Sequence, residues 1–117
     1  LFNPELLAKE KGGFGEKCFD SIVESDIDVR KDLYENIILS GGNTKFRGLP
    51  ERLEYQVKER APEAIKAIVK VIAIPERKYS EWIGGSILSS ISTFDTMWGT
   101  KQEYEEAGCT IVHRKCF

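Results

Sequence analysis

Apolar residues recur at helical spacing along much of the chain. Near the N-terminal end they fall every four residues, which predicts an amphipathic helix from Phe14 to about Ser25. A second short helix is predicted over 29–36, because two aspartates near its start are good N-caps. Further along, Pro50 is expected at the first position of a helix that Pro62 ends.

Two other apolar runs predict strands. The run 37–39 is short, continuous and rich in β-branched residues, which is typical of a buried strand. The run 68–73 alternates in a way that predicts a strand of mixed burial. Helical spacing returns from Tyr79, with two further helical pieces over 94–98 and 101–107. Because helices and strands are mixed, the expected class is α/β or α+β.

Composition and charge argue against some classes of protein. The 117 residues are 41% hydrophobic and 31% charged, which suits one soluble domain with a modest core or a piece of a larger one. The net charge of −2 gives no bulk attraction to nucleic acid or to an anionic membrane. No apolar run approaches the roughly 20 residues of a membrane-spanning helix. The start at Leu1, without Met, leads us to expect a fragment.

Three cysteines and one histidine are too few and too scattered to predict a disulfide framework or a zinc site. A reducing, cytoplasmic setting fits this composition best. Cys116, next to the C-terminus, is expected to be exposed and reactive, since chain termini are usually mobile.

Ser40-Gly41-Gly42 ends the first predicted strand, and Phe46 follows the turn. Glycines at a strand end allow a sharp turn, or let a flat ligand approach the backbone. Taken alone, these residues favour a plain turn. Lys78, taken alone beside other charged residues, favours a solvated side chain.

Longer motifs then point to a family. LSGGNTKF, PERKYSEWIGGSILSSISTFDTMW, KQEYEEAG and the terminal IVHRKCF resemble, in this order, the C-terminal third of the actin family, over essentially all of the chain. The resemblance implies the α/β, ribonuclease H-like fold of the actin-like ATPases, with this chain as the C-terminal portion of a two-lobed molecule. It assigns residues 1–78 to the large-lobe subdomain that meets the nucleotide and neighbouring subunits, and 79–117 to the C-terminal helices of the barbed-end subdomain.

The resemblance also implies the adenosine side of a nucleotide cleft. The backbone of Gly42, with Gly41 beside it, would approach ATP; Phe46 would flank the adenine, and Lys78 would close from the other side. The cofactor implied for the intact protein is ATP or ADP with Mg or Ca. No phosphate loop or set of metal-binding acids is visible in this sequence, so the chain alone is not expected to hydrolyse ATP and offers no catalytic residue.

Two kinds of protein contact are implied as well. A hydrophobic cleft for partner helices would be lined by Ile83, Ile87, Leu88, Ile91, Thr93 and Met97, although the same spacing equally indicates ordinary core. Filament contacts would include Leu6, Leu7, Asp26, Ile27 and Asp28. Lys9 stands where the family has an apolar residue, which predicts altered lateral contacts.

The expected function is that of an actin-like cytoskeletal protein that binds ATP and polymerises. Its expected partners are other actin subunits, actin-binding proteins and the N-terminal part of the same protein, and not nucleic acid. The alternative is a nucleotide-independent interaction or filament-capping module. A sugar kinase or chaperone of the same superfamily is disfavoured by WIGGSIL and HRKCF. The pair Gly84-Gly85 inside the predicted helix is expected to allow close packing.

Overall fold

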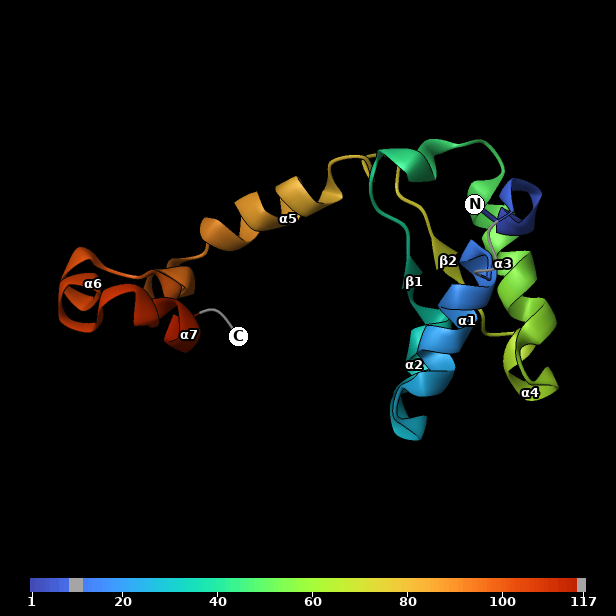
Figure 1. Ribbon diagram of the computed structural model, residues 1–117, viewed down its shortest axis with the longest axis horizontal. Helices are drawn as coiled ribbons and strands as arrows, with labels where there is room; N and C mark the ends of the chain where they lie inside the picture. The colour runs from blue at the N-terminus through green and yellow to red at the C-terminus, as the bar shows by residue number, and fades with distance from the viewer. Residues whose placement is uncertain (9–11, 116–117) are drawn as a thin grey trace. The chain divides into compact units, whose positions relative to one another are not determined.

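The computed structural model describes residues 1–8 and 12–115, and the chain divides into two compact units. Unit 1 is Leu1–Ser80 and unit 2 is Glu81–Phe117 (Figure 1). The described chain is rich in helix and has one small sheet. None of the described helices is both long enough and apolar enough to cross a membrane.

Unit 1 places helices beside a parallel pair of strands. Its described elements run α1 (Phe14–Glu24), α2 (Ile27–Glu35), β1 (Ile37–Ile38), α3 (Leu49–Arg60), α4 (Glu63–Lys66) and β2 (Val71–Ile72), with 3₁₀ helices η1 (Pro4–Leu7) and η2 (Gly42–Lys45). Ile37 lies opposite Val71, and Ile38 lies opposite Ile72. Helix α3 packs against both α1 and β2.

The helix predictions are confirmed for α1 and α3, with shifts at some ends. Helix α2 begins at Ile27 rather than 29, because Asp26 is its N-cap and accepts a hydrogen bond from the Asp28 backbone N–H at 3.0 Å. Helix α3 begins at Leu49, one residue before the predicted Pro50. The single-turn helix α4 was not predicted, since four residues are too few to show a period.

The strand prediction for 37–39 is correct in position and only half correct in burial. Ile37 N–H donates to the Lys70 carbonyl at 3.2 Å and Leu39 N–H donates to the Ile72 carbonyl at 2.9 Å, so the ladder spans the predicted run. Leu39 is 3% exposed, whereas Ile38 is 68% exposed. Successive side chains of a strand point to opposite faces, and only one face of β1 is covered within unit 1.

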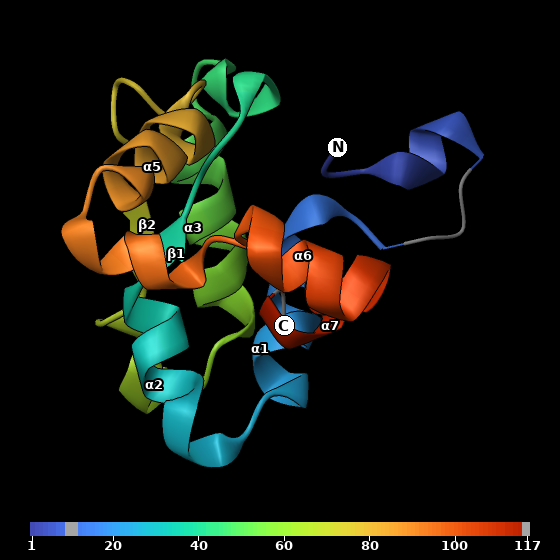
Figure 2. The same ribbon diagram turned by 90° about the vertical axis from the view of Figure 1, so that its left-hand side faces the viewer.

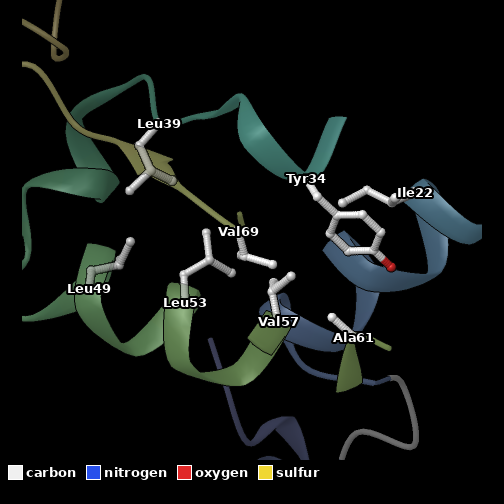
Figure 3. Packing of buried hydrophobic residues seen from close by; sticks show 8 residues of the cluster. All are labelled: Ile22, Tyr34, Leu39, Leu49, Leu53, Val57, Ala61 and Val69. Atoms are coloured by element: carbon white, nitrogen blue, oxygen red, sulfur yellow. The ribbon is translucent and has the colours of Figure 1, made fainter. Parts of the chain in front are cut away.

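One face of α3 and its C-cap residue together supply half of the buried core cluster of unit 1. Figure 3 shows Leu49, Leu53 and Val57 in a row along α3, followed by its C-cap residue Ala61. They face Leu39, just after β1, Val69, just before β2, and Tyr34 and Ile22 from α2 and α1. The three α3 positions are spaced by four residues, so they share one side of the helix.

Helices α1 and α3 approach so closely at Gly15 that only glycine fits. A Cβ at Gly15 would lie 2.2 Å from Gln56 Oε1 and 2.8 Å from Gln56 Cβ. The second of these atoms sits next to the backbone and cannot swing away. The contact fixes the distance between the two helices.

Unit 2 consists of short helices. In addition to α5 (Ser80–Ser89), which begins at the last residue of unit 1, it contains η3 (Ser92–Met97), α6 (Lys101–Ala107), η4 (Gly108–Thr110) and α7 (Ile111–Lys115). Helices α6 and α7 pack together (Figure 2), and Ile111 is buried. The predicted helix 101–107 is confirmed, whereas α7 was not predicted.

Within unit 2, Gly84 and Gly85 do not serve the close packing that the sequence predicts. A Cβ built at either position has no atom within 4 Å other than those of its chain neighbours and of the backbone of its own helix. The same helix carries exposed Trp82 and Ile87, so its faces are open within unit 2. The two glycines therefore cost helix stability without gaining a contact inside this unit.

A capping box stabilises the start of α6, and its Glu103 also forms an ion pair with Lys115 of α7. The Thr100 backbone N–H donates to Glu103 Oε2 at 2.8 Å, and the Glu103 N–H donates to Thr100 Oγ1 at 3.2 Å. Lys115 Nζ lies 3.0 Å from Glu103 Oε1 and also donates to the Thr96 and Trp98 carbonyls. These hydrogen bonds, first that from the Thr100 backbone and then those from Lys115 and Thr100, lower the pKa of Glu103 below its ordinary value of 4.5.

The lowered pKa predicts acid sensitivity in unit 2. The ionised Glu103 is favoured in the folded state, so its stabilisation is full above the unfolded pKa and is lost as the pH falls through the folded one. In Glu103→Gln, the unfolding midpoint of the full-length protein should fall less on acidification than in the wild type. Glu105→Gln on the same helix is the matched control and should keep the wild-type slope. Equal slopes for all three proteins would contradict the prediction.

Candidate functional site

Two loops meet at the carboxyl edge of the small sheet. Parallel strands end at the same edge, so the segment after β1 and the segment after β2 are brought together. The Gly41 N–H donates to the Arg77 carbonyl at 2.8 Å, and Lys45 Nζ donates to the Pro75 carbonyl at 2.8 Å. Crevices outside the carboxyl ends of parallel strands are common ligand sites.

Gly41 makes the turn. Its φ of 89° and ψ of 160° fall in a region that is essentially open to glycine only. Its carbonyl accepts two hydrogen bonds from Thr44, from the backbone N–H at 3.1 Å and from Oγ1 at 2.7 Å. The requirement for a glycine at 41 is therefore conformational.

Gly42 differs from Gly41, because no contact or backbone strain within unit 1 requires a glycine at this position. It does not have a positive φ, and a Cβ at this position would meet only Lys78 Cγ, at 3.9 Å. The first residue of η2 thus lies beside the aliphatic part of Lys78. Two of the residues that the sequence assigned to the same site are therefore close in space.

Phe46 and Lys78 are both available to a ligand. Phe46 follows η2 directly and is 63% exposed. Lys78 is exposed, with Nζ 4.9 Å from the centroid of the Tyr79 ring. An exposed ring and a long aliphatic stem with a cationic end suit a flat base.

Arg77 is the residue of this region that sequence reasoning missed. Its guanidinium donates to the Thr44 carbonyl from Nε at 3.3 Å and from Nη2 at 3.2 Å. Nη1 donates to the Ile74 carbonyl at 3.0 Å. The only available signal was its place in PERKYS next to Lys78, because its partners are backbone carbonyls distant in sequence.

The residues predicted for the partner cleft lie in unit 2, on α5, on η3 and between them. Of this set, Ile83 is half-buried and the others are exposed: Ile87, Leu88, Ile91, Thr93 and Met97. Within unit 2 they are therefore not the core residues that the alternative interpretation expected.

The residues predicted for filament contacts are exposed as well. Leu6 and Leu7 lie on η1, and Asp26, Ile27 and Asp28 form the start of α2. Lys9 and Cys116, for which altered lateral contacts and a reactive thiol were predicted, lie outside the described residues.

Away from these loops, a hollow of about 500 Å³ lies in unit 1 between α1 and β1. Its wall includes Phe14, Cys18 and the exposed Ile38. Burial raises the pKa of the Cys18 thiol, which disfavours the reactive thiolate. Among residues 1–8 and 12–115, no group of three or more His, Cys, Asp or Glu side chains is placed to hold a metal ion.

Comparison with known families identifies a match over the whole sequence. The family model described as Actin matches this chain over residues 1–117. The match covers the whole sequence, and it includes both loops at the carboxyl edge of the sheet as well as all of unit 2.

Proposed function

The chain belongs to the actin family, and on that premise we propose that it supplies the adenosine side of a nucleotide cleft that binds ATP or ADP. The observation that carries the proposal is the proximity of Gly42 to Lys78 at the carboxyl edge of the sheet, where a Cβ at position 42 would lie 3.9 Å from Lys78 Cγ. Gly41 and Phe46 would complete the surface that faces adenosine.

The chemistry of these residues fits an adenosine group. A glycine exposes its backbone because it has no Cβ to collide with a sugar. The stem of Lys78 and the ring of Phe46 offer apolar surface to a base, and the ammonium group adds a cation. ATP, with Mg or Ca, would bring the phosphates and the metal. We assign no residue of this chain to hydrolysis, and the residues named here bind and orient the nucleoside.

We further propose the wider role that the family suggests. The fold would be the α/β, ribonuclease H-like fold of actin-like ATPases, with residues 1–78 in the large lobe and 79–117 in the barbed-end subdomain. The protein would form cytoskeletal filaments in the cytoplasm with other actin subunits. The exposed side chains of η1 and of the start of α2 support filament contacts, since each surface leaves large apolar groups, Leu6 and Ile27, open to solvent.

Replacing Lys78 should weaken ATP binding. In full-length protein, we expect Lys78→Ala to raise the Kd for ATP about tenfold, or ~1.4 kcal/mol, because both stem and charge are lost. Lys78→Met keeps most of the apolar stem and should lose less. Displacement of a fluorescent ATP analogue measures both values.

Lys70→Ala is the matched control, because Lys70 is also an exposed lysine but precedes β2, at the opposite end of that strand. Its Kd for ATP should stay at the wild-type value. If Lys78→Ala and Lys70→Ala bind ATP equally well, the assignment of Lys78 to the adenosine side is wrong.

A second candidate function is a nucleotide-independent interaction or filament-capping module. The exposed apolar side chains Ile87, Leu88 and Met97 favour it, since a groove for partner helices needs such a surface. Full-length protein that caps actin filaments, and does so equally with and without ATP, would support this candidate over the first.

A further inference from the structure

Arg77 joins the two loops at the carboxyl edge of the sheet through both its side chain and its backbone. We propose that Arg77 is a positioning residue, which holds η2 at the distance from Lys78 that an adenosine group requires. The inference rests on the proposed function, because it assigns a role within the same nucleotide site.

The side chain acts as a two-sided clamp. Nε and Nη2 both donate to the Thr44 carbonyl, near the end of η2, at 3.3 and 3.2 Å. On its other side, Nη1 donates to the Ile74 carbonyl at 3.0 Å and to the Ala73 carbonyl at 3.4 Å. A guanidinium group carries its donors in a fixed plane, so these contacts set the spacing between the loops.

The backbone of the same residue holds the beginning of the loop. The Arg77 carbonyl accepts hydrogen bonds from the Gly41 N–H at 2.8 Å and from Ser40 Oγ at 3.3 Å. It also accepts from Ser80 Oγ at 3.2 Å, and the Ser40 and Ser80 hydroxyls are hydrogen-bonded to each other. Residues on both sides of Gly42 are therefore anchored to Arg77.

Loss of the guanidinium would free only one end of the loop. The Gly41 contact is made by the Arg77 backbone and survives any side-chain substitution, whereas the Thr44 carbonyl loses both of its donors from this residue. Since Gly42 and Phe46 flank that anchored segment, their positions relative to Lys78 would vary. A lysine cannot reproduce the clamp, because its ammonium is a single point on a flexible stem.

The test measures binding of two ligands to the full-length protein. ATP carries adenosine, whereas inorganic tripolyphosphate carries only the phosphate chain. For Arg77→Met we expect the Kd for ATP to rise about tenfold, with the Kd for tripolyphosphate within about twofold of wild type. Arg77→Lys should recover only part of the loss. Arg47→Met, which removes an exposed arginine next to Phe46, is the control and should change neither value.

Each other outcome has a distinct meaning. Equal losses for ATP and tripolyphosphate would show a general structural defect and overturn the positioning role, as would ATP binding at the wild-type level in Arg77→Met. A wild-type Kd for ATP in Arg77→Lys would contradict the claim that the planar guanidinium is needed to space the two loops. If wild-type protein does not bind ATP at all, the proposed function fails first, and this inference falls with it.

Discussion

Leu53→Ala is expected to lower the free energy of unfolding by about 2–5 kcal/mol. Leu53 is 1% exposed and lies in the middle of the buried face of α3 (Figure 3). The substitution removes buried methyl groups and leaves a cavity that neighbours in a close-packed core fill only in part. Denaturant unfolding of the full-length protein, followed by circular dichroism, measures the change.

Leu6→Ala is the matched control for this substitution. Leu6 is 84% exposed, so the same chemical change should alter the free energy of unfolding by no more than about 0.5 kcal/mol. Comparable losses at the two positions would contradict the placement of the core on α3.

Gly41→Ala is expected to destabilise the folded protein by about 1–3 kcal/mol and to weaken ATP binding as well. The strain arises from the backbone conformation and not from a collision, because a Cβ at this position would have open space within 4 Å. The chain can relieve the strain by changing the turn. Doing so would disturb the hydrogen bond from the Gly41 N–H to the Arg77 carbonyl. Thermal unfolding and ATP titration of the full-length protein measure the two effects.

Gly85→Ala is the matched control for Gly41→Ala, and it is not expected to destabilise the protein. Gly85 lies inside α5, has no positive φ and has equal space for a Cβ. Alanine favours a helix interior over glycine by up to about 1 kcal/mol, so this variant should be neutral or slightly more stable. A loss in Gly85→Ala as large as in Gly41→Ala would show that space, and not backbone conformation, decides both results.

Local pattern was sufficient to predict most of the helices. The spacing of apolar residues predicted the positions of α1 and α3. Helix α6 begins with the sequence pattern of a capping box, Thr100 followed three residues later by Glu103. The same local pattern did not predict which side chains of a strand are buried. The run 37–39 indicates a strand covered on both faces, yet the cover on a given face is set by elements from elsewhere in the chain, and Ile38 is exposed in unit 1.

Contacts between distant segments explain the remaining differences. Nothing near Gly15 in the sequence indicates that Gln56 of α3 lies against it, and the open surroundings of Gly84 and Gly85 are equally invisible to a single sequence. The proximity of Gly42 to Lys78 could be expected only through the family resemblance, since these positions are remote in sequence. Arg77 was missed because its partners are backbone carbonyls, which any residue supplies.

Photolabelling with an azido derivative of ATP would test the central claim most directly. Full-length protein is incubated with 8-azido-ATP, irradiated and digested, and the adducts are mapped by mass spectrometry. The proposed site predicts labelled residues within 40–46 or 76–79, and excess ATP should suppress this labelling. Labelling that ATP suppresses only at other positions, with these two segments unlabelled, would contradict an adenosine site between Gly42 and Lys78.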